Sequence, residues 1–100
     1  MHFSLSRKEF RAVYSQSISK PIGDLLFYYS NYSSPRLGLI VSKKYGNAVS
    51  RNLFKRRIRE IFIHKILQAN INMAIIIKPL KKDIKYSAIN NSFDKLISLL

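Results

Sequence analysis

Residues 36–59, RLGLIVSKKYGNAVSRNLFKRRIR, run from an apolar stretch through a basic loop into a long amphipathic segment. Residues 36–42 are rich in aliphatic side chains between polar ends, which favours a strand. In the loop that follows, Gly46 allows close backbone approach, and Asn47 is a suitable helix N-cap. Apolar residues then recur at helical spacing. The sequence therefore predicts its longest helix at residues 48–67.

The segments on either side predict the rest of a small α/β domain. Residues 6–9, Ser-Arg-Lys-Glu, have the capping-box form S-x-x-E, which marks the start of a helix. Five elements are expected in all outside the quoted stretch: a helix at 6–17, an irregular connection or short edge strand at 19–23, a strand at 25–29, a buried strand at 73–78 and a final helix at 86–100.

The expected order is α-β-β-α-β-α, with room for a small extra strand near residue 18. Strand 36–42 is predicted to pair antiparallel with strand 25–29, because only a short turn separates them. Helices against one sheet make an α/β sandwich, so this is the predicted fold class.

Composition restricts the class of protein. The chain has 100 residues, 47% of them hydrophobic, and no cysteine, which predicts one packed domain without disulfides or cysteine-bound zinc. No apolar run approaches the roughly 20 residues of a membrane span, and no signal peptide is visible, so a cytoplasmic location is expected. Eighteen Lys and Arg face five acidic residues, and the net charge of +13 favours a polyanionic partner over a merely solubilising surface.

Residues suited to catalysis are few. His2 and His64 are the only histidines, and neither has a partner at metal-ligand spacing. The five acidic residues are scattered, and no glycine-rich phosphate loop or nucleophile elbow is present. We therefore expect no catalytic residue, no metal site and no cofactor on this chain.

The strongest functional signal is a cationic face on the predicted long helix. Its members follow i, i+3, i+4, i+7 spacing, with one more on the flank, and we call them the basic ridge: Asn52, Lys55, Arg56 and Arg59, with Arg51. Apolar residues occupy a different face, suited to packing on a sheet: Phe54, Ile58, Ile61 and Phe62. Like charges four residues apart destabilise a helix, so an ordinary solvated face is the less favoured interpretation. Arginine and lysine on one face suit phosphate binding.

Aromatic residues form a second constellation. Phe10 and Tyr14 lie one helical turn apart, and strand alternation places Phe27 and Tyr29 on one face of the sheet and Tyr28 on the other. One face can build the core, while the other can line a groove in which single-stranded bases stack. For any one of these aromatics taken alone, core packing is the favoured interpretation.

The quoted stretch resembles the signature of the bacterial ribonuclease P protein component. That pattern is roughly R-x-G-x-x-V-S-K-K-x-G-x-A-V-x-R-N-R-x-K-R-x-x-R-E, and residues 36–60 fit it closely. Residues 5–14, 74–79 and 86–96 also resemble the family, so the resemblance covers nearly the whole chain. One position departs: Leu53 stands where the family usually has arginine.

The resemblance implies more than composition does. It implies a mixed sheet of about four strands with a left-handed β-α-β crossover. It implies the protein subunit of an endoribonuclease that removes the 5′ leader from precursor tRNA, with the catalytic centre and its Mg²⁺ on the RNA subunit. The chain would bind that RNA and the single-stranded leader, and so raise substrate affinity. No membrane and no obligate protein partner are expected.

The contacts that the resemblance implies fall into two groups. The first is expected to bind the catalytic RNA: Lys43, Lys44, Asn47, Arg51, Asn52, Lys55, Arg56, Arg57 and Arg59. The second is expected to hold the leader in a groove between the first helix and the sheet: Phe10, Tyr14, Tyr28, Ser42 and Lys43. Arg57 is expected to replace part of the charge missing at position 53.

Other functions stay open on the sequence alone. A ribosomal or general RNA-binding protein would explain the charge but not the motif. An independent metal-dependent nuclease would need acids or histidines that meet in space. Binding to DNA or to an anionic membrane is the least favoured possibility.

Overall fold

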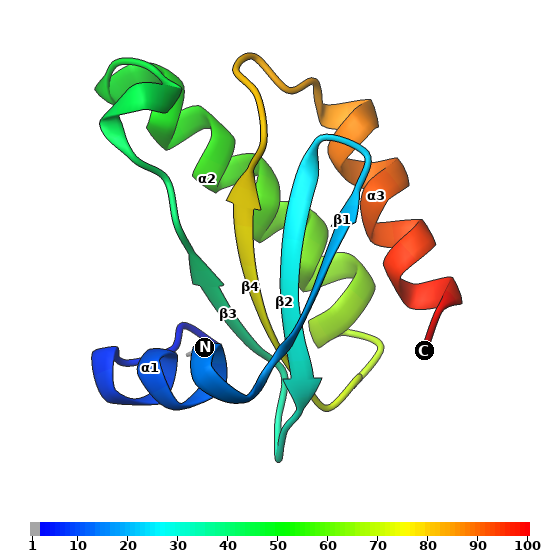
Figure 1. The fold of residues 1–100 in the computed structure, drawn as a ribbon. Coiled ribbons are helices and arrows are strands. Elements are labelled where there is room, and N and C mark those ends of the chain that lie inside the picture. The colour runs from blue at the N-terminus through cyan, green and yellow to red at the C-terminus, as the bar shows by residue number, and fades with distance from the viewer. Residues whose placement is uncertain (1–2) are drawn as a thin grey trace.

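The computed structural model describes residues 3–100, so His2 lies outside the described part. Seven elements follow one another along the chain: α1 (Arg7–Gln16), β1 (Ile18–Ile22), β2 (Leu25–Asn31), β3 (Arg36–Leu39), α2 (Ala48–Phe62), β4 (Met73–Pro79) and α3 (Tyr86–Ser98) (Figure 1). A 3-10 turn, η1 (Lys43–Tyr45), precedes α2, and a π-helical turn, η2 (Ile63–Leu67), extends it. The predicted α-β-β-α-β-α order is confirmed, and the extra strand near residue 18 exists as β1.

Both predicted helix starts are built as the sequence indicates. The Ser6 side chain accepts the Glu9 backbone N–H at 3.2 Å, while Glu9 accepts the Ser6 backbone N–H at 2.9 Å. The Asn47 side chain accepts the Ser50 N–H at 2.9 Å. Each bond satisfies a backbone donor that has no partner within the first helical turn. Local side-chain chemistry therefore sets where α1 and α2 begin.

The sheet corrects one prediction. Its strand order is β1-β2-β4-β3, with β3 parallel to β4 and the other pairs antiparallel. The predicted antiparallel pairing of strand 36–42 with strand 25–29 is wrong, because β4 lies between β2 and β3. The residues from Met73 to Ile77 are all buried, so β4 needs covered faces and a partner strand on each side. A central place in the sheet meets both needs.

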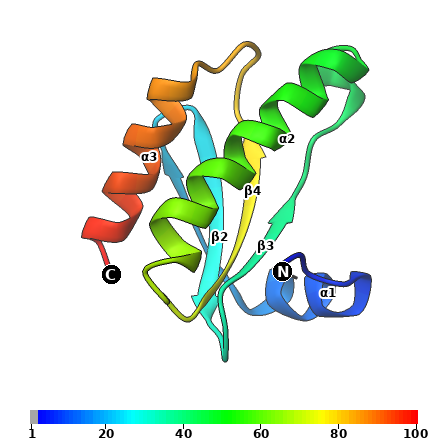
Figure 2. The same cartoon turned by 180° about the vertical axis from the view of Figure 1, so that it is seen from behind.

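The connection from β3 through α2 to β4 is left-handed, as the family resemblance implies. In Figure 1 both strands point upward, α2 lies behind the sheet, and β4 lies to the right of β3. Figure 2, from behind, shows the same crossover with α2 in front. Right-handed crossovers are the strong rule for this type of unit, so the handedness is a distinctive feature of the fold.

The helices are shared unequally between the faces of the sheet. Both α2 and α3 cover one face, and α1 alone crosses the other (Figures 1 and 2). The main core lies under α2 and α3, and strand alternation sends Ile75 and Ile77 of β4 into it. On the opposite face Ala74 and Ile76 pack with Val13 of α1 in a smaller cluster. One ten-residue helix covers only part of that face. In the described part of the chain, no helix has the length and apolar character needed to cross a membrane.

Candidate nucleic-acid interface

A carboxylate attaches α1 to the sheet. One oxygen of Glu9 serves the capping box, and the other accepts the Tyr32 hydroxyl at 3.1 Å and lies 3.8 Å from the Arg36 guanidinium. The pKa of Glu9 is lowered, first by the hydrogen bond from the Ser6 backbone, then by the Ser6 hydroxyl, Tyr32 and Arg36. We call Glu9, Tyr32 and Arg36 the α1 clamp, since they fix the helix relative to β2 and β3.

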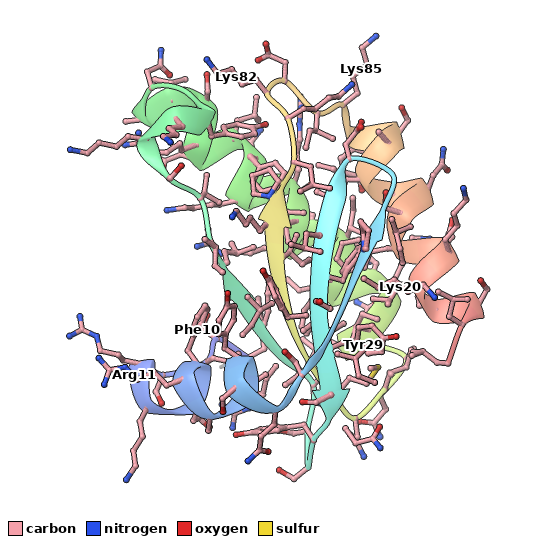
Figure 3. All side chains as sticks on the ribbon, viewed as in Figure 1. Phe10, Arg11, Lys20, Tyr29, Lys82 and Lys85 are labelled. Carbon is pink, nitrogen blue, oxygen red and sulfur yellow. The ribbon has the colours of Figure 1, made fainter. Side chains whose placement is uncertain are left out.

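Three aromatic side chains follow one another beside the clamp on the open face of the sheet. The Phe10 and Tyr14 ring centroids are 6.1 Å apart, and those of Tyr14 and Tyr28 are 4.7 Å apart. A hydrogen bond with Tyr14 raises the pKa of Tyr28. Figure 3 shows Phe10 directed from α1 toward the sheet. Phe10 and Tyr14 of α1 and Tyr28 of β2 thus form one aromatic row.

Gly38 of β3 makes room for the first ring of this row. A Cβ atom at position 38 would come within 2.8 Å of the Phe10 ring and within 3.1 Å of Ile76. Any other residue there would push Phe10 away from the sheet. The position therefore needs glycine for close approach, and its backbone φ is ordinary.

Ser42 and Lys43 lie at the entrance to α2, and a depression of about 360 Å³ opens beside them. Its lining comes from the segment between β3 and α2 and from the end of β4 with the loop that follows it: Ile40, Ser42, Lys44, Tyr45, Lys78, Pro79, Leu80, Lys81 and Lys82. Sequence reasoning missed Lys78, Lys81 and Lys82, treating them as a strand end and a charged loop. The dense run KPLKK was visible, but no local motif places it next to the α2 entrance.

The basic ridge has the predicted orientation. Phe54, Ile58, Ile61 and Phe62 are buried on the opposite side of α2. Asn52, Arg56 and Arg59 are exposed, and Lys55 is half-buried. Arg56 has 71% of its side chain accessible and approaches Glu60 at 3.9 Å, an exposed pair that contributes little stability. The face is therefore cationic and largely available to a ligand.

Three residues assigned to the catalytic RNA also have structural partners. Asn47 caps α2, and the Arg51 guanidinium donates to the Gly46 carbonyl at 2.9 Å. The Arg57 guanidinium donates to the Ile84 carbonyl at 3.2 Å, on the side of α2 that faces α3. Arg57 is half-buried there, and this contact gives it a role in joining α2 to the segment before α3.

The two predicted groups of residues meet at the edge of the sheet. A second depression, of about 250 Å³, lies between α1 and α2 across β3. Phe10 lines it from one side, and Lys55 and Arg59 line it from the other. Within residues 3–100, no three His, Asp or Glu side chains come together as metal ligands. The chemistry offered by this surface is cationic and aromatic.

These features define a class: a small basic α+β domain with a mixed four-stranded sheet, a left-handed crossover and an aromatic row beside a cationic helix. The family model for ribonuclease P matches residues 4–100. The chain belongs to the ribonuclease P protein family.

Individual relatives agree with this assignment. The ribonuclease P protein component of Bacillus pumilus is 40% identical over 78 residues, covering 72% of this chain but only 66% of that protein. That of Staphylococcus epidermidis is 35% identical over 95 residues, covering 91% of this chain and 83% of that protein. The solved structure of the Staphylococcus aureus RNase P protein superimposes with a TM-score of 0.79 at 31% identity, covering 99% of this chain and 95% of that one.

Proposed function

We propose that this chain is the RNA-binding protein subunit of ribonuclease P, the ribonucleoprotein that removes the 5′ leader from precursor tRNA. One observation carries the proposal: in a member of this family, the aromatic row stands on an open sheet face directly beside a cationic helix. Aromatic rings stack unpaired bases, and cations neutralise the phosphates between them. This combination suits a single strand held next to a larger RNA.

The basic ridge and the aromatic row have different roles in this proposal. The basic ridge, with Lys43, Lys44 and Asn47, binds the RNA subunit through its phosphates, and the arginine forks supply paired hydrogen bonds. The aromatic row, with Ser42 and Lys43 beyond it, holds the leader. The RNA subunit supplies the catalytic centre and Mg²⁺. The protein raises affinity for the substrate, and it acts in the bacterial cytoplasm without an obligate protein partner.

Reconstitution tests the proposal. The protein is assembled with a bacterial ribonuclease P RNA at low Mg²⁺, and cleavage and binding are measured for precursor and mature tRNA. We expect the protein to increase leader removal and to favour the precursor over the mature tRNA, because only the precursor carries a leader. Equal affinity for the two tRNAs, with no gain in cleavage, would instead support a general RNA-binding protein.

The same assay includes the protein without RNA subunit. Cleavage of precursor by the protein alone would support an independent nuclease. We expect none, because a metal-dependent nuclease needs clustered metal ligands, and within residues 3–100 no three His, Asp or Glu side chains come together.

A further inference from the structure

The depression between α1 and α2 is built from parts that the proposed function treats separately. Phe10 and Leu5 line it from the α1 side, Gly38 forms part of its base on β3, and Lys55 and Arg59 line it from α2. Because β3 is the edge strand, no further strand separates α2 from the open face of the sheet at this point. Two cations of the basic ridge therefore reach the side of the molecule that presents Phe10.

These two cations are available for a ligand. Within residues 3–100, the salt bridges and side-chain hydrogen bonds include neither Lys55 nor Arg59. No acidic residue lines the depression. Apart from Ser4 and Gly38, its remaining lining residues carry aliphatic or aromatic side chains: Leu5, Phe10, Leu37 and Leu39. Two unneutralised charges beside an apolar wall suit a group that is anionic at one end and flat and apolar at the other, which describes a nucleotide.

We infer that Lys55 and Arg59 bind a backbone phosphate of the leader, next to the nucleotide whose base lies against Phe10. The inference rests on the proposed function and sharpens it, since both residues were assigned only to the RNA subunit. It makes the inner flank of the basic ridge part of the leader site.

The side chains of the basic ridge point in different directions around the axis of α2. Arg56 is the neighbour of Lys55 in sequence but points about 100° away around the helix axis. Arg56 is absent from the depression, and its side chain is 71% accessible. A ligand that touches Phe10 can therefore reach Lys55 and Arg59, while Arg56 faces a partner on the outer side of α2.

The experiment compares three neutral variants, Lys55→Gln, Arg59→Gln and Arg56→Gln, in the holoenzyme assembled with its RNA subunit. Glutamine keeps most of the side-chain stem, so packing along the helix is preserved. Binding of precursor and of mature tRNA is titrated against salt. We expect Lys55→Gln and Arg59→Gln to weaken precursor binding several-fold and to reduce its log–log salt slope by about 0.7, the value for one single-strand phosphate. Binding of mature tRNA should keep its wild-type slope.

Arg56→Gln is the matched control, and it should weaken assembly with the RNA subunit without changing the preference for precursor over mature tRNA. A second measurement uses precursors with one uncharged methylphosphonate at successive leader positions. At one position the neutral linkage should weaken wild-type binding strongly and Arg59→Gln binding less, because one of the two cations that contact this phosphate has already been removed.

Two results would overturn the inference. A methylphosphonate effect that is the same in wild type and in Arg59→Gln at every position overturns it. So does an equal loss of precursor and mature tRNA binding in the Arg59 and Lys55 variants, which returns both residues to the RNA subunit. If wild type shows no preference for precursor, the proposed function fails as well, so the two failures are distinguishable.

Discussion

At the scale of single residues, the packing of α1 on the open face of the sheet depends on a glycine. Gly38 lets the Phe10 ring lie against β3, where a Cβ atom would come within 2.8 Å of it. Phe10 in turn stands 6.1 Å from Tyr14, and Tyr14 stands 4.7 Å from Tyr28. The position of the aromatic row is therefore sensitive to volume at Gly38.

Gly38→Ala should destabilise the protein by about 1–3 kcal/mol, the usual cost of overpacking a tight contact. The free energy of unfolding is measured by denaturant titration in wild type, in both single variants and in the double variant with Phe10→Ala. The cost of Gly38→Ala should be smaller in the Phe10→Ala background, because the clash partner has been removed. Additive costs would show that Phe10 is not what limits volume at position 38.

A substitution of Tyr14 can test binding with little effect on folding, because 45% of the residue is exposed. Tyr14→Ala should lower precursor affinity by about 1–3 kcal/mol, the usual worth of one stacking ring, with only a small loss of stability. Tyr86→Ala is the control, because Tyr86 is 43% exposed but lies on α3, across the sheet from the aromatic row. Similar effects of the two variants on precursor affinity would argue against the aromatic row as the leader site.

At the scale of elements, α1 is held by few contacts. Its single fully buried residue is Val13, and the polar α1 clamp supplies the attachment at its N-terminal end. The clamp depends on the ionised form of Glu9. A hydrogen-bonded carboxylate with a lowered pKa links the stability of an element to pH.

Glu9→Gln should lose stability relative to wild type at neutral pH but not in acid. Because the folded pKa of Glu9 lies below its ordinary 4.5, its contribution is complete above about that pH and is lost as pH falls through the lowered value. Unfolding is followed from neutral pH to about pH 3. Tyr32→Phe removes one donor only and should show a smaller difference. A stability gap that is independent of pH would remove ionised Glu9 from the attachment of α1.

At the scale of the whole molecule, charge and shape act together. A net charge of +13 is held on a chain with a radius of gyration of 12.5 Å. The four salt bridges within residues 3–100 neutralise only a minority of the cations. Figure 3 shows Lys82 and Lys85 at the end of the molecule away from α1. Lys82 lines the depression beside the entrance to α2, and Lys85 directly precedes α3. Self-repulsion therefore opposes the compact state when no polyanion is bound.

The melting temperature should accordingly rise when NaCl is raised from about 0.05 to about 0.5 M, because salt shortens the range of repulsion. The double variant Lys82→Gln/Lys85→Gln lowers the net charge by two, from +13 to +11, and should show a weaker dependence on salt. Thermal unfolding followed by circular dichroism checks both. A melting temperature that falls with salt in both proteins would show that salt bridges outweigh repulsion.

Local rules explain the parts of this fold that the sequence predicted. The capping box at Ser6, the N-cap at Asn47 and the buried face of α2 depend on spacings of three or four residues, and all three are confirmed. The alternation of Phe27 and Tyr28 between faces depends on a period of two, and it too is confirmed. The aromatic row required more, since its members had to be assigned to one groove through the family resemblance.

The sequence by itself determined where elements begin, which faces they bury and which side of α2 is cationic, because these follow from neighbours within one or two turns. Only the tertiary structure decided that β4 separates β2 from β3, that Arg57 contacts Ile84, and that Lys55 and Arg59 share a depression with Phe10. The physical reason is that the place of a strand in the sheet depends on which elements can cover its two faces. Those elements come from residues far apart in the chain.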